Sequence, residues 1–133
     1  MNNLRIRLVQ ADLQWESPAK NLQRLDQQIA SLDGQVDLIV LPEMFTTGFT
    51  MDVESNAESS KNELQFVSTV EKMQAWAKSK DAVICGSIII EENDKYYNRL
   101  YFVEPNGEVH QYDKRHLFRM AGEDEHYSAG NEK

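Results

Sequence analysis

The chain has 133 residues and a mass of 15.4 kDa, which suits one domain with a hydrophobic core of its own. Hydrophobic residues make up 41% of the chain and charged residues 27%, a balance that excludes a disordered or low-complexity protein. The net charge of −8 disfavours binding to nucleic acid and to anionic membrane surfaces, because both carry negative charge themselves.

Cysteine usage and hydropathy indicate the compartment. Cys85 is the one cysteine of the sequence, so no internal disulfide can form and a cytosolic protein is expected. Arg5 and Arg7 interrupt any apolar run near the start, so we expect no signal peptide. No stretch approaches the roughly 18 apolar residues of a membrane-spanning helix. The mean hydropathy of −0.60 also fits a soluble, cytoplasmic protein.

The first third of the chain alternates strand and helix patterns. From Leu4 to Leu8, apolar residues alternate with arginines, which predicts a strand with one buried face. Ser17 and Pro18 then predict a helix start, and Gly34 the helix end. Apolar residues at steps of three and four indicate a helix of about four turns between them. These residues are Ala19, Leu22, Leu25, Ile29 and Leu32.

Two nearly continuous apolar runs predict strands that are buried on both faces. The runs are Val36–Leu41 and Ala82–Ile90, and such strands are typical of parallel sheets. A loop is expected over residues 42–51 and a polar surface segment over 52–62. A second helix is expected between the loop and the later run, because apolar residues again recur at helical spacing. These residues are Leu64, Val67, Val70, Met73 and Ala77, with Trp76 beside them.

The remaining pattern is two hairpins and a tail. Residues 92–95 predict a turn between Ala82–Ile90 and a strand at Tyr96–Val103. Residues 105–107 predict a second turn before a short strand that ends at Tyr112. The order β-α-β-α-β-β-β predicts an α/β fold with a layered architecture, in one domain without repeats or linkers. The tail from Arg119 to Lys133 has little periodicity, so the chain looks interrupted.

Glu43 is the first candidate for chemistry. It lies two residues past the predicted strand Val36–Leu41, and Pro42 restricts the backbone between them. In open α/β sheets, ligands bind at the carboxyl ends of strands. A carboxylate beside a hydrophobic strand end could therefore serve as a general base. The alternative is an ordinary solvated loop glutamate.

Lys114 is the second candidate, because it also follows a predicted strand. It could reach the same end of the sheet and stabilise a developing oxyanion. The alternative is a salt-bridged basic cluster at the surface. His116, two residues further on, is more typical of a hydrogen-bonded structural histidine than of a base.

Other residue types give weaker indications. Cys85 lies within an apolar strand, so we expect it to be an inert structural thiol with a raised pKa. The histidines lack a metal-ligand spacing, so no metal site is predicted. No glycine-rich phosphate loop and no Cys-x-x-Cys pair are present. Met44, Phe45 and Phe49 could line a pocket, although core packing explains them nearly as well.

Two motifs together resemble the nitrilase superfamily of carbon–nitrogen hydrolases. They are Leu41–Phe45, continued by Thr47–Phe49, and Tyr112–Phe118. The run Lys114–Ala121 and the later Tyr127–Gly130 are similar to the ω-amidase branch of that superfamily. The resemblance covers essentially the whole chain and implies an α-β-β-α sandwich.

The resemblance also implies roles for individual residues. The superfamily uses a Glu-Lys-Cys triad, in which Glu43 would be the general base and Lys114 the oxyanion stabiliser. Glu123 matches an additional glutamate that orients the lysine and the substrate, with Asp124 and Glu125 as adjacent alternatives. The nucleophilic cysteine follows a later strand that lies beyond Lys133, and Cys85 cannot replace it. Residues 1–133 are therefore expected to be the N-terminal half of the domain.

The implied reaction is hydrolysis of an amide through a thioester, without metal or organic cofactor. The resemblance suggests ω-amides of 2-oxo dicarboxylic acids, such as 2-oxoglutaramate, as small-molecule substrates, and it makes a homodimer plausible. The 133-residue chain alone is expected to be inactive. We also expect it to expose apolar surface along Val36–Leu41 and Ala82–Ile90, where the missing half would pack.

Two other classes of protein remain open. One is a non-catalytic binding or assembly module of α/β fold, in which Glu43 and Lys114 are structural. The other is a small flavodoxin-like domain for signalling or nucleotide binding. It requires a phosphate-binding loop after the first strand, and Ala11–Trp15 offers no glycine for one.

Overall fold

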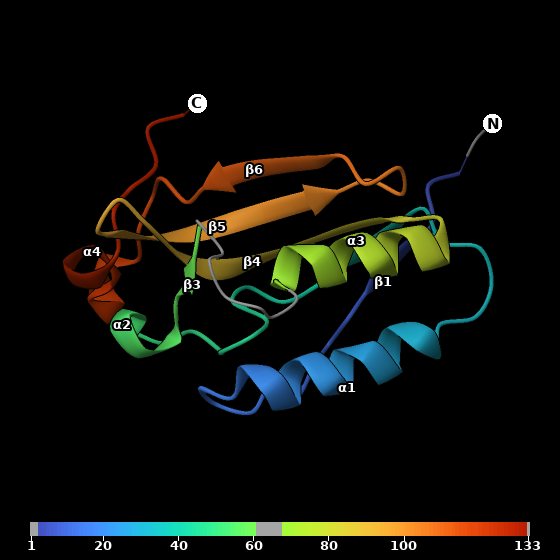
Figure 1. Cartoon of the computed structure of the whole chain (residues 1–133), viewed down its shortest axis with the longest axis horizontal. Coiled ribbons are helices and arrows are strands. Elements are labelled where there is room, and N and C mark those ends of the chain that lie inside the picture. Colours follow the sequence, from blue (N-terminus) through green and yellow to red (C-terminus); the bar gives the residue numbers. More distant parts are fainter. Residues whose placement is uncertain (1–2, 61–67, 133) are drawn as a thin grey trace.

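The computed structural model describes residues 3–60 and 68–132. Figure 1 shows their arrangement, with the longer helices lying along a twisted sheet and the short ones at one end of it. In chain order the elements are β1 (Ile6–Leu8), α1 (Pro18–Ala30), β2 (Leu38–Val40), α2 (Val53–Asn56), β3 (Glu58–Ser59), α3 (Thr69–Lys80), β4 (Val83–Glu92), β5 (Lys95–Val103), β6 (Val109–Asp113), the 3₁₀ turn η1 (Arg119–Ala121) and α4 (Glu123–His126). The α/β class expected from the sequence is confirmed.

The sheet has the strand order β1-β2-β4-β5-β6, and β3 pairs with the end of β4. The strands β1, β2 and β4 are parallel, whereas β5 and β6 each pair antiparallel with the strand before them. Two reversals of direction restore the original one, so β6 runs in the same direction as β2. The carboxyl ends of β2 and β6 therefore lie at the same edge of the sheet.

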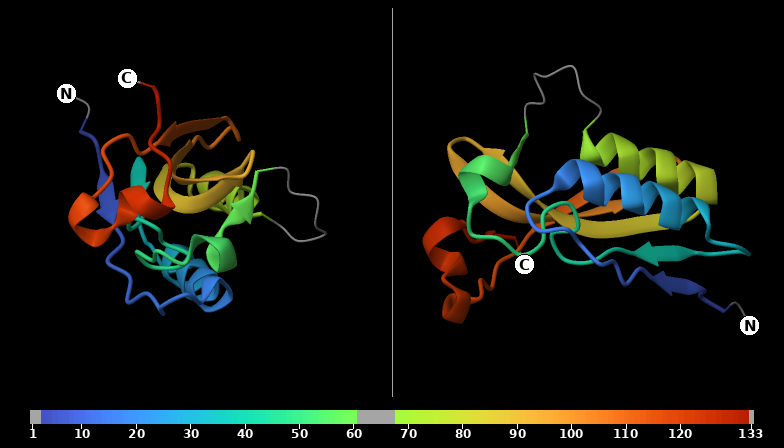
Figure 2. Two further views of the ribbon diagram at one scale, coloured as in Figure 1. Left: turned by 90° about the vertical axis from the view of Figure 1, so that its left-hand side faces the viewer. Right: turned by 90° about the horizontal axis from the view of Figure 1, so that it is seen from below.

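The helices α1 and α3 lie side by side on one face of the sheet (Figure 2). Leu25 and Ile29 of α1 and Met73 of α3 are at most 1% exposed and belong to one core cluster with the sheet. Asp26 joins the two helices, since it accepts hydrogen bonds from Lys72 and from the Trp76 indole. This layer of helix and sheet is the main hydrophobic core.

The helix ends differ slightly from the expectation. Pro18 is the first residue of α1 as predicted, but α1 ends at Ala30, and Gly34 lies in the turn that follows it. In α3, the Ser68 side chain accepts from the Glu71 backbone while Glu71 accepts from the Ser68 backbone, a reciprocal cap that sets the helix start. Leu64 and Val67 of the predicted stripe lie outside the described residues.

The other face of the sheet carries an apolar surface that no described helix covers. Strand pairing places its residues side by side across the sheet, and they are 37–77% exposed. They are Ile6, Leu8, Leu100, Phe102 and Tyr112, which we call the open face. Val40 and Cys85 lie between them and are half-buried.

The open face corrects two details of the sequence analysis. The strand β1 has no buried residue, because its apolar side chains lie on this uncovered face. Exposure is greatest on β1, β5 and β6 rather than along Val36–Leu41 and Ala82–Ile90. Within those two segments, Val40 and Cys85 are half-buried and Ile39 and Ile84 are fully buried under the helices, whereas residues 86–90 are buried throughout.

Short elements account for the remaining differences. The polar segment expected from residue 52 contains α2 and β3, and the aperiodic tail contains η1 and α4. Each has only two to four residues, too few for a periodic pattern to show. In the part of the chain that is described, no helix has the length and apolar character needed to cross a bilayer.

Candidate active site

Glu43 and Lys114 meet at one edge of the sheet. Glu43 lies in the loop after β2, and Lys114 is the first residue after β6. The Lys114 Nζ atom donates to Oε1 of Glu43 at 2.8 Å. The matching directions of β2 and β6 therefore bring together two residues that are far apart in the sequence.

Close backbone packing positions Lys114. Its backbone N–H donates to the Asn98 carbonyl at 2.9 Å, and its own carbonyl accepts from the Gly130 N–H at 3.1 Å. Gly130 lies so close to β6 that a Cβ atom there would be 2.2 Å from the Asp113 carbonyl oxygen. Only glycine allows this approach, so the 127–130 segment packs directly against the backbone beside the lysine.

The loop that carries Glu43 is held by β4. The backbone N–H of Met44 donates to the Ser87 hydroxyl at 3.0 Å, and that of Phe45 donates to the Ser87 carbonyl at 3.1 Å. The Phe45 ring lies against Gly86, where a Cβ atom would be 2.7 Å from the ring. Met44 and Phe45 are fully buried, so of the three pocket candidates these two are core residues.

Glu123 completes the group and is fully buried. Its Oε2 atom lies 3.1 Å from Nζ of Lys114 and accepts from the Phe118 backbone N–H at 2.6 Å. It is the first residue of α4, whereas its neighbours Asp124 and Glu125 are exposed. Of the three adjacent acids, Glu123 is the one that contacts the lysine.

Asn98 is a member of the site that sequence reasoning missed. It lies on β5, is 3% exposed, and donates from Nδ2 to Oε1 of Glu43 at 2.7 Å. The same nitrogen lies 3.4 Å from Oε1 of Glu123. The available signal was an asparagine inside a predicted strand, a residue type that is depleted there.

The charges of the site favour a protonated lysine. Burial lowers the pKa of Lys114, but the hydrogen bonds to Glu43 and Glu123 outweigh burial and raise it above 10.5. Burial and the nearby charges of Glu123 and Glu43 raise the pKa of Tyr127, whose hydroxyl donates to the Thr50 carbonyl at 2.6 Å. The site thus holds one ammonium between two carboxylates, beside a neutral phenol.

A cavity of about 300 Å³ opens beside these groups toward the open face. Glu43 and Lys114 line it together with apolar residues of the sheet such as Val40 and Leu100. Cys85 also lines it, which the sequence did not suggest, and burial raises the pKa of its thiol. A thiol with a raised pKa is a poor nucleophile at neutral pH. The Phe49 ring lies 5.4 Å from Nζ of Lys114 and shields it from one side.

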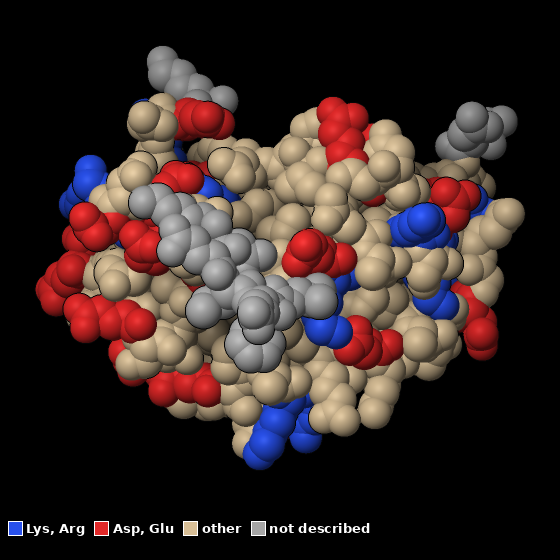
Figure 3. All heavy atoms as spheres, viewed as in Figure 1, with Lys and Arg blue, Asp and Glu red and all other residues tan. Residues whose placement is uncertain are grey.

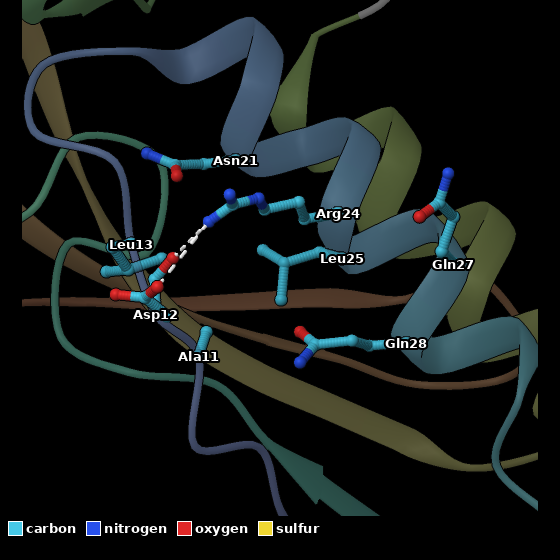
Figure 4. A pocket seen from close by; sticks show the side chains of 8 residues that line it. All are labelled: Ala11, Asp12, Leu13, Asn21, Arg24, Leu25, Gln27 and Gln28. Atoms are coloured by element: carbon cyan, nitrogen blue, oxygen red, sulfur yellow. Dashed lines mark hydrogen bonds and ion pairs between the residues drawn. The ribbon is translucent and has the colours of Figure 1, made fainter.

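A second cavity lies on α1, away from these charges (Figure 4). It measures about 320 Å³, and Arg24 reaches across it to the Asp12 carbonyl at 2.7 Å. The buried Asn21 at its wall is hydrogen-bonded to Gln14 and Thr46. Its residues offer no nucleophile or buried acid, so we do not assign the reaction here.

The histidines lie apart from the site chemistry. His116 and His126 are exposed. His110 lies 2.9 Å from a Glu104 oxygen, and Glu108 is near enough for the three ligand atoms to lie within 4.8 Å of one another. Sequence spacing missed this cluster because a turn brings its members together. It is a hydrogen-bonded cluster at the surface of a hairpin, and we assign no metal ion to it.

Acidic side chains gather at the end of the molecule where α2 and α4 lie, on the left in Figure 3. Asp124 and Glu125 of α4 and Glu54 of α2 contribute to this charge. This charge lies beside Glu123, the first residue of α4, so a phosphate backbone would be repelled there.

Comparison with known proteins identifies the family. The family model for carbon–nitrogen hydrolases matches residues 5–131. The chain belongs to this family, and the resemblance to the nitrilase superfamily is confirmed. The flavodoxin-like alternative is therefore no longer supported.

Similar proteins specify the relationship further. The chain is 44% identical to omega-amidase YafV of Escherichia coli K12 over 98% of this chain, and 27% identical to 2-oxoglutaramate amidase of Bacillus subtilis over 96%. It covers 48% of each of these relatives, so it spans about half of their length.

Among solved structures, XC1258 of Xanthomonas campestris, a CN-hydrolase superfamily protein with an arsenic adduct in its active site, aligns with a TM-score of 0.89 and 38% identity. The alignment covers 99% of this chain and 48% of XC1258. Nit3 of Saccharomyces cerevisiae, at 24% identity and a TM-score of 0.77, supports the fold alone.

Proposed function

We propose that the protein containing this chain is an amidohydrolase that releases ammonia from ω-amides of 2-oxo dicarboxylic acids. The observation that carries the proposal is the contact of Lys114 with both Glu43 and Glu123 at the rim of an open cavity. An acid and a cation at one cavity are the groups that base catalysis and oxyanion stabilisation require. The names of the relatives support the substrate class.

In the proposed mechanism, Glu43 takes the proton of a cysteine thiol, and the thiolate attacks the amide carbonyl carbon. The carbonyl oxygen becomes an oxyanion, which the Lys114 ammonium stabilises. Glu43 then passes its proton to the amide nitrogen, the C–N bond breaks, and ammonia leaves a thioester. Glu43 next takes a proton from water, the hydroxide attacks the thioester, and the proton returns to the departing thiolate. Glu123 orients Lys114, and Phe49 lines the substrate side.

We propose further that residues 1–133 are the N-terminal half of an α-β-β-α sandwich. The length of the relatives supports this, and so does the open face, which exposes Leu8 and Phe102 at the surface. Large apolar side chains that are aligned on one face normally pack against another layer. In this proposal the second sheet covers the open face and supplies the nucleophilic cysteine.

The test compares ammonia release by the full-length protein with that of the 133-residue chain. We expect the full-length protein to hydrolyse 2-oxoglutaramate and 2-oxosuccinamate faster than glutamine or asparagine, and the short chain to release no ammonia. Activity of the short chain would contradict a nucleophile outside it. A full-length protein that binds amides without hydrolysing them would support the binding module instead.

Sedimentation of the full-length protein would test the homodimer, which stays a prediction.

A further inference from the structure

Asn98 connects the two glutamates of the site without adding a charge. Its Nδ2 atom lies 2.7 Å from Oε1 of Glu43 and 3.4 Å from Oε1 of Glu123. A side-chain amide nitrogen has two N–H groups, so one can point toward each carboxylate. At 3% exposure, Asn98 has little water to replace these partners.

We propose that Asn98 is a positioning residue for the reaction. It gives the two oxygens of Glu43 different roles, one held by hydrogen bonds and the other open to accept a proton. This inference rests on the proposed amidohydrolase function. Oε1 accepts from both Lys114 at 2.8 Å and Asn98 at 2.7 Å, and is the anchored oxygen. Within the described residues, no hydrogen bond reaches Oε2. Oε2 is therefore the oxygen that accepts and returns the proton.

Two donors on one oxygen restrict rotation of the carboxylate. Turning Glu43 by half a revolution would exchange its oxygens, and smaller rotations would stretch both hydrogen bonds. Lys114 alone would leave the group free to swing about a single contact, because Glu43 lies in a loop and half of its side chain is exposed. Asn98 lies on a strand paired on both sides, so it is a rigid second support.

The neutrality of Asn98 matters for the basicity of Glu43. A second cation at this position would balance both carboxylates and weaken the base, whereas an amide holds the carboxylate and leaves one negative charge in excess. The charged and titratable groups around Glu43 are Lys114 after β6, Glu123 from α4, Tyr127 after α4, and Cys85 from β4. Asn98 therefore holds both glutamates without adding a charge to the site.

The experiment replaces Asn98 with leucine, which has a similar volume and no donor, in the full-length protein. We expect kcat for ammonia release from 2-oxoglutaramate to fall by about tenfold or more, while KM changes by less than about twofold. The acid limb of the kcat/KM profile should move to higher pH, because the ionised carboxylate has lost a donor. A purely structural role would not move that limb.

Asn21→Leu is the matched control, since Asn21 is also buried and hydrogen-bonded but lies on α1. We expect it to lower the melting temperature without moving the acid limb. Asn98→Ser serves if the leucine variant does not fold. It keeps one donor and should give a smaller shift in the same direction.

Three results would overturn the proposal. The first is an active wild-type protein whose Asn98→Leu variant keeps its kcat and its acid limb. The second is failure of both Asn98 variants to fold, which would assign the residue to the fold rather than to the reaction. The third is a wild-type protein that releases no ammonia from any amide. That result refutes the proposed function itself and is recognised without any variant.

Discussion

Two clusters of the same charge composition lie next to each other at the end of the β5–β6 hairpin. In one, Lys114 lies between Glu43 and Glu123. In the other, Arg99 pairs with Asp113 at 2.6 Å and with Glu92 at 3.0 Å. Asp113 immediately precedes Lys114, and successive strand residues point to opposite faces, so the sheet separates the two clusters.

The clusters differ in which charge is buried. The Arg99 side chain is 3% exposed, and its two carboxylates extend toward solvent. Its hydrogen bonds to Asp113 raise its pKa further, so it remains a cation at every accessible pH. In the other cluster Glu123 is the buried member, while Lys114 and Glu43 line the cavity. Clusters of equal composition thus form a structural clamp on one face and, in the proposed mechanism, the catalytic acid and lysine on the other.

The largest predicted effect is on activity. Glu43→Gln in the full-length protein should lower ammonia release by at least about a hundredfold, because glutamine has nearly the same shape but cannot accept the proton. The matched variant is Glu92→Gln in the Arg99 cluster, which should leave activity within about twofold. A steady-state ammonia assay measures both. Equal losses in the two variants would remove the functional distinction between the clusters.

The second prediction concerns stability. Arg99→Leu should lower the free energy of unfolding by about 2–4 kcal/mol, because it removes a buried cation and leaves Asp113 and Glu92 facing each other. Denaturant unfolding of the full-length protein measures this. Arg24→Leu, which removes an exposed arginine with a 3.9 Å ion pair, should cost less than about 1 kcal/mol. A similar loss of unfolding free energy in both variants would mean that the burial of Arg99 does not contribute to stability.

A third variant probes the backbone contact that both clusters share. Gly130→Ala places a Cβ atom 2.2 Å from the Asp113 carbonyl oxygen, so β6 and the 127–130 segment must separate. We expect a loss of about 1–3 kcal/mol in stability together with a loss of activity, because the Lys114 carbonyl bonds to Gly130. Gly34→Ala, where only the positive φ is strained, should cost about 1 kcal/mol and no activity. Unaltered kinetics in Gly130→Ala would show that the lysine does not depend on this contact.

The smallest expected effect is a pH dependence. The pKa of Lys114 is raised above 10.5 in the folded protein, so its ion pairs stabilise the fold fully below pH 10.5 and lose that effect as the pH rises through the raised value. The difference in unfolding free energy between wild type and Lys114→Met should thus stay constant between about pH 7 and pH 9. This difference in unfolding free energy should become smaller only above pH 10.5. Narrowing already near neutral pH would mean that the amine is not held as an ammonium.

The sequence was most informative where the apolar periodicity defined a strand and the carboxyl end of that strand carried a polar or charged residue. Alternating elements predict the α/β class, and the rule that ligands bind at the carboxyl ends of strands makes Glu43 and Lys114 candidates, whereas their catalytic roles came from the resemblance. The choice of Glu123 came only from the resemblance, because the sequence alone does not distinguish it from the acidic residues Asp124 and Glu125 beside it. Only the fold distinguishes the buried acid of the three.

Tertiary contacts explain what could not be predicted. Asn98 belongs to the site because Glu43 and Glu123, both distant in the sequence, contact it. The residues next to Asn98 in the sequence do not indicate these contacts. The exposure of β1 was missed since alternation shows which residues share a face but not whether that face is covered. The Ser68–Glu71 cap was a readable signal that would have placed the start of α3 correctly.

The alternation along β6 has a consequence for quality control of folding. Because Asp113 and Lys114 serve opposite faces, a hairpin that closed one residue out of register would turn both side chains to the wrong sides at once. Such a chain would lose its arginine clamp together with the lysine of the proposed mechanism. Misfolded copies would then be unstable as well as inactive in that mechanism, and their lower stability would expose them to proteolysis.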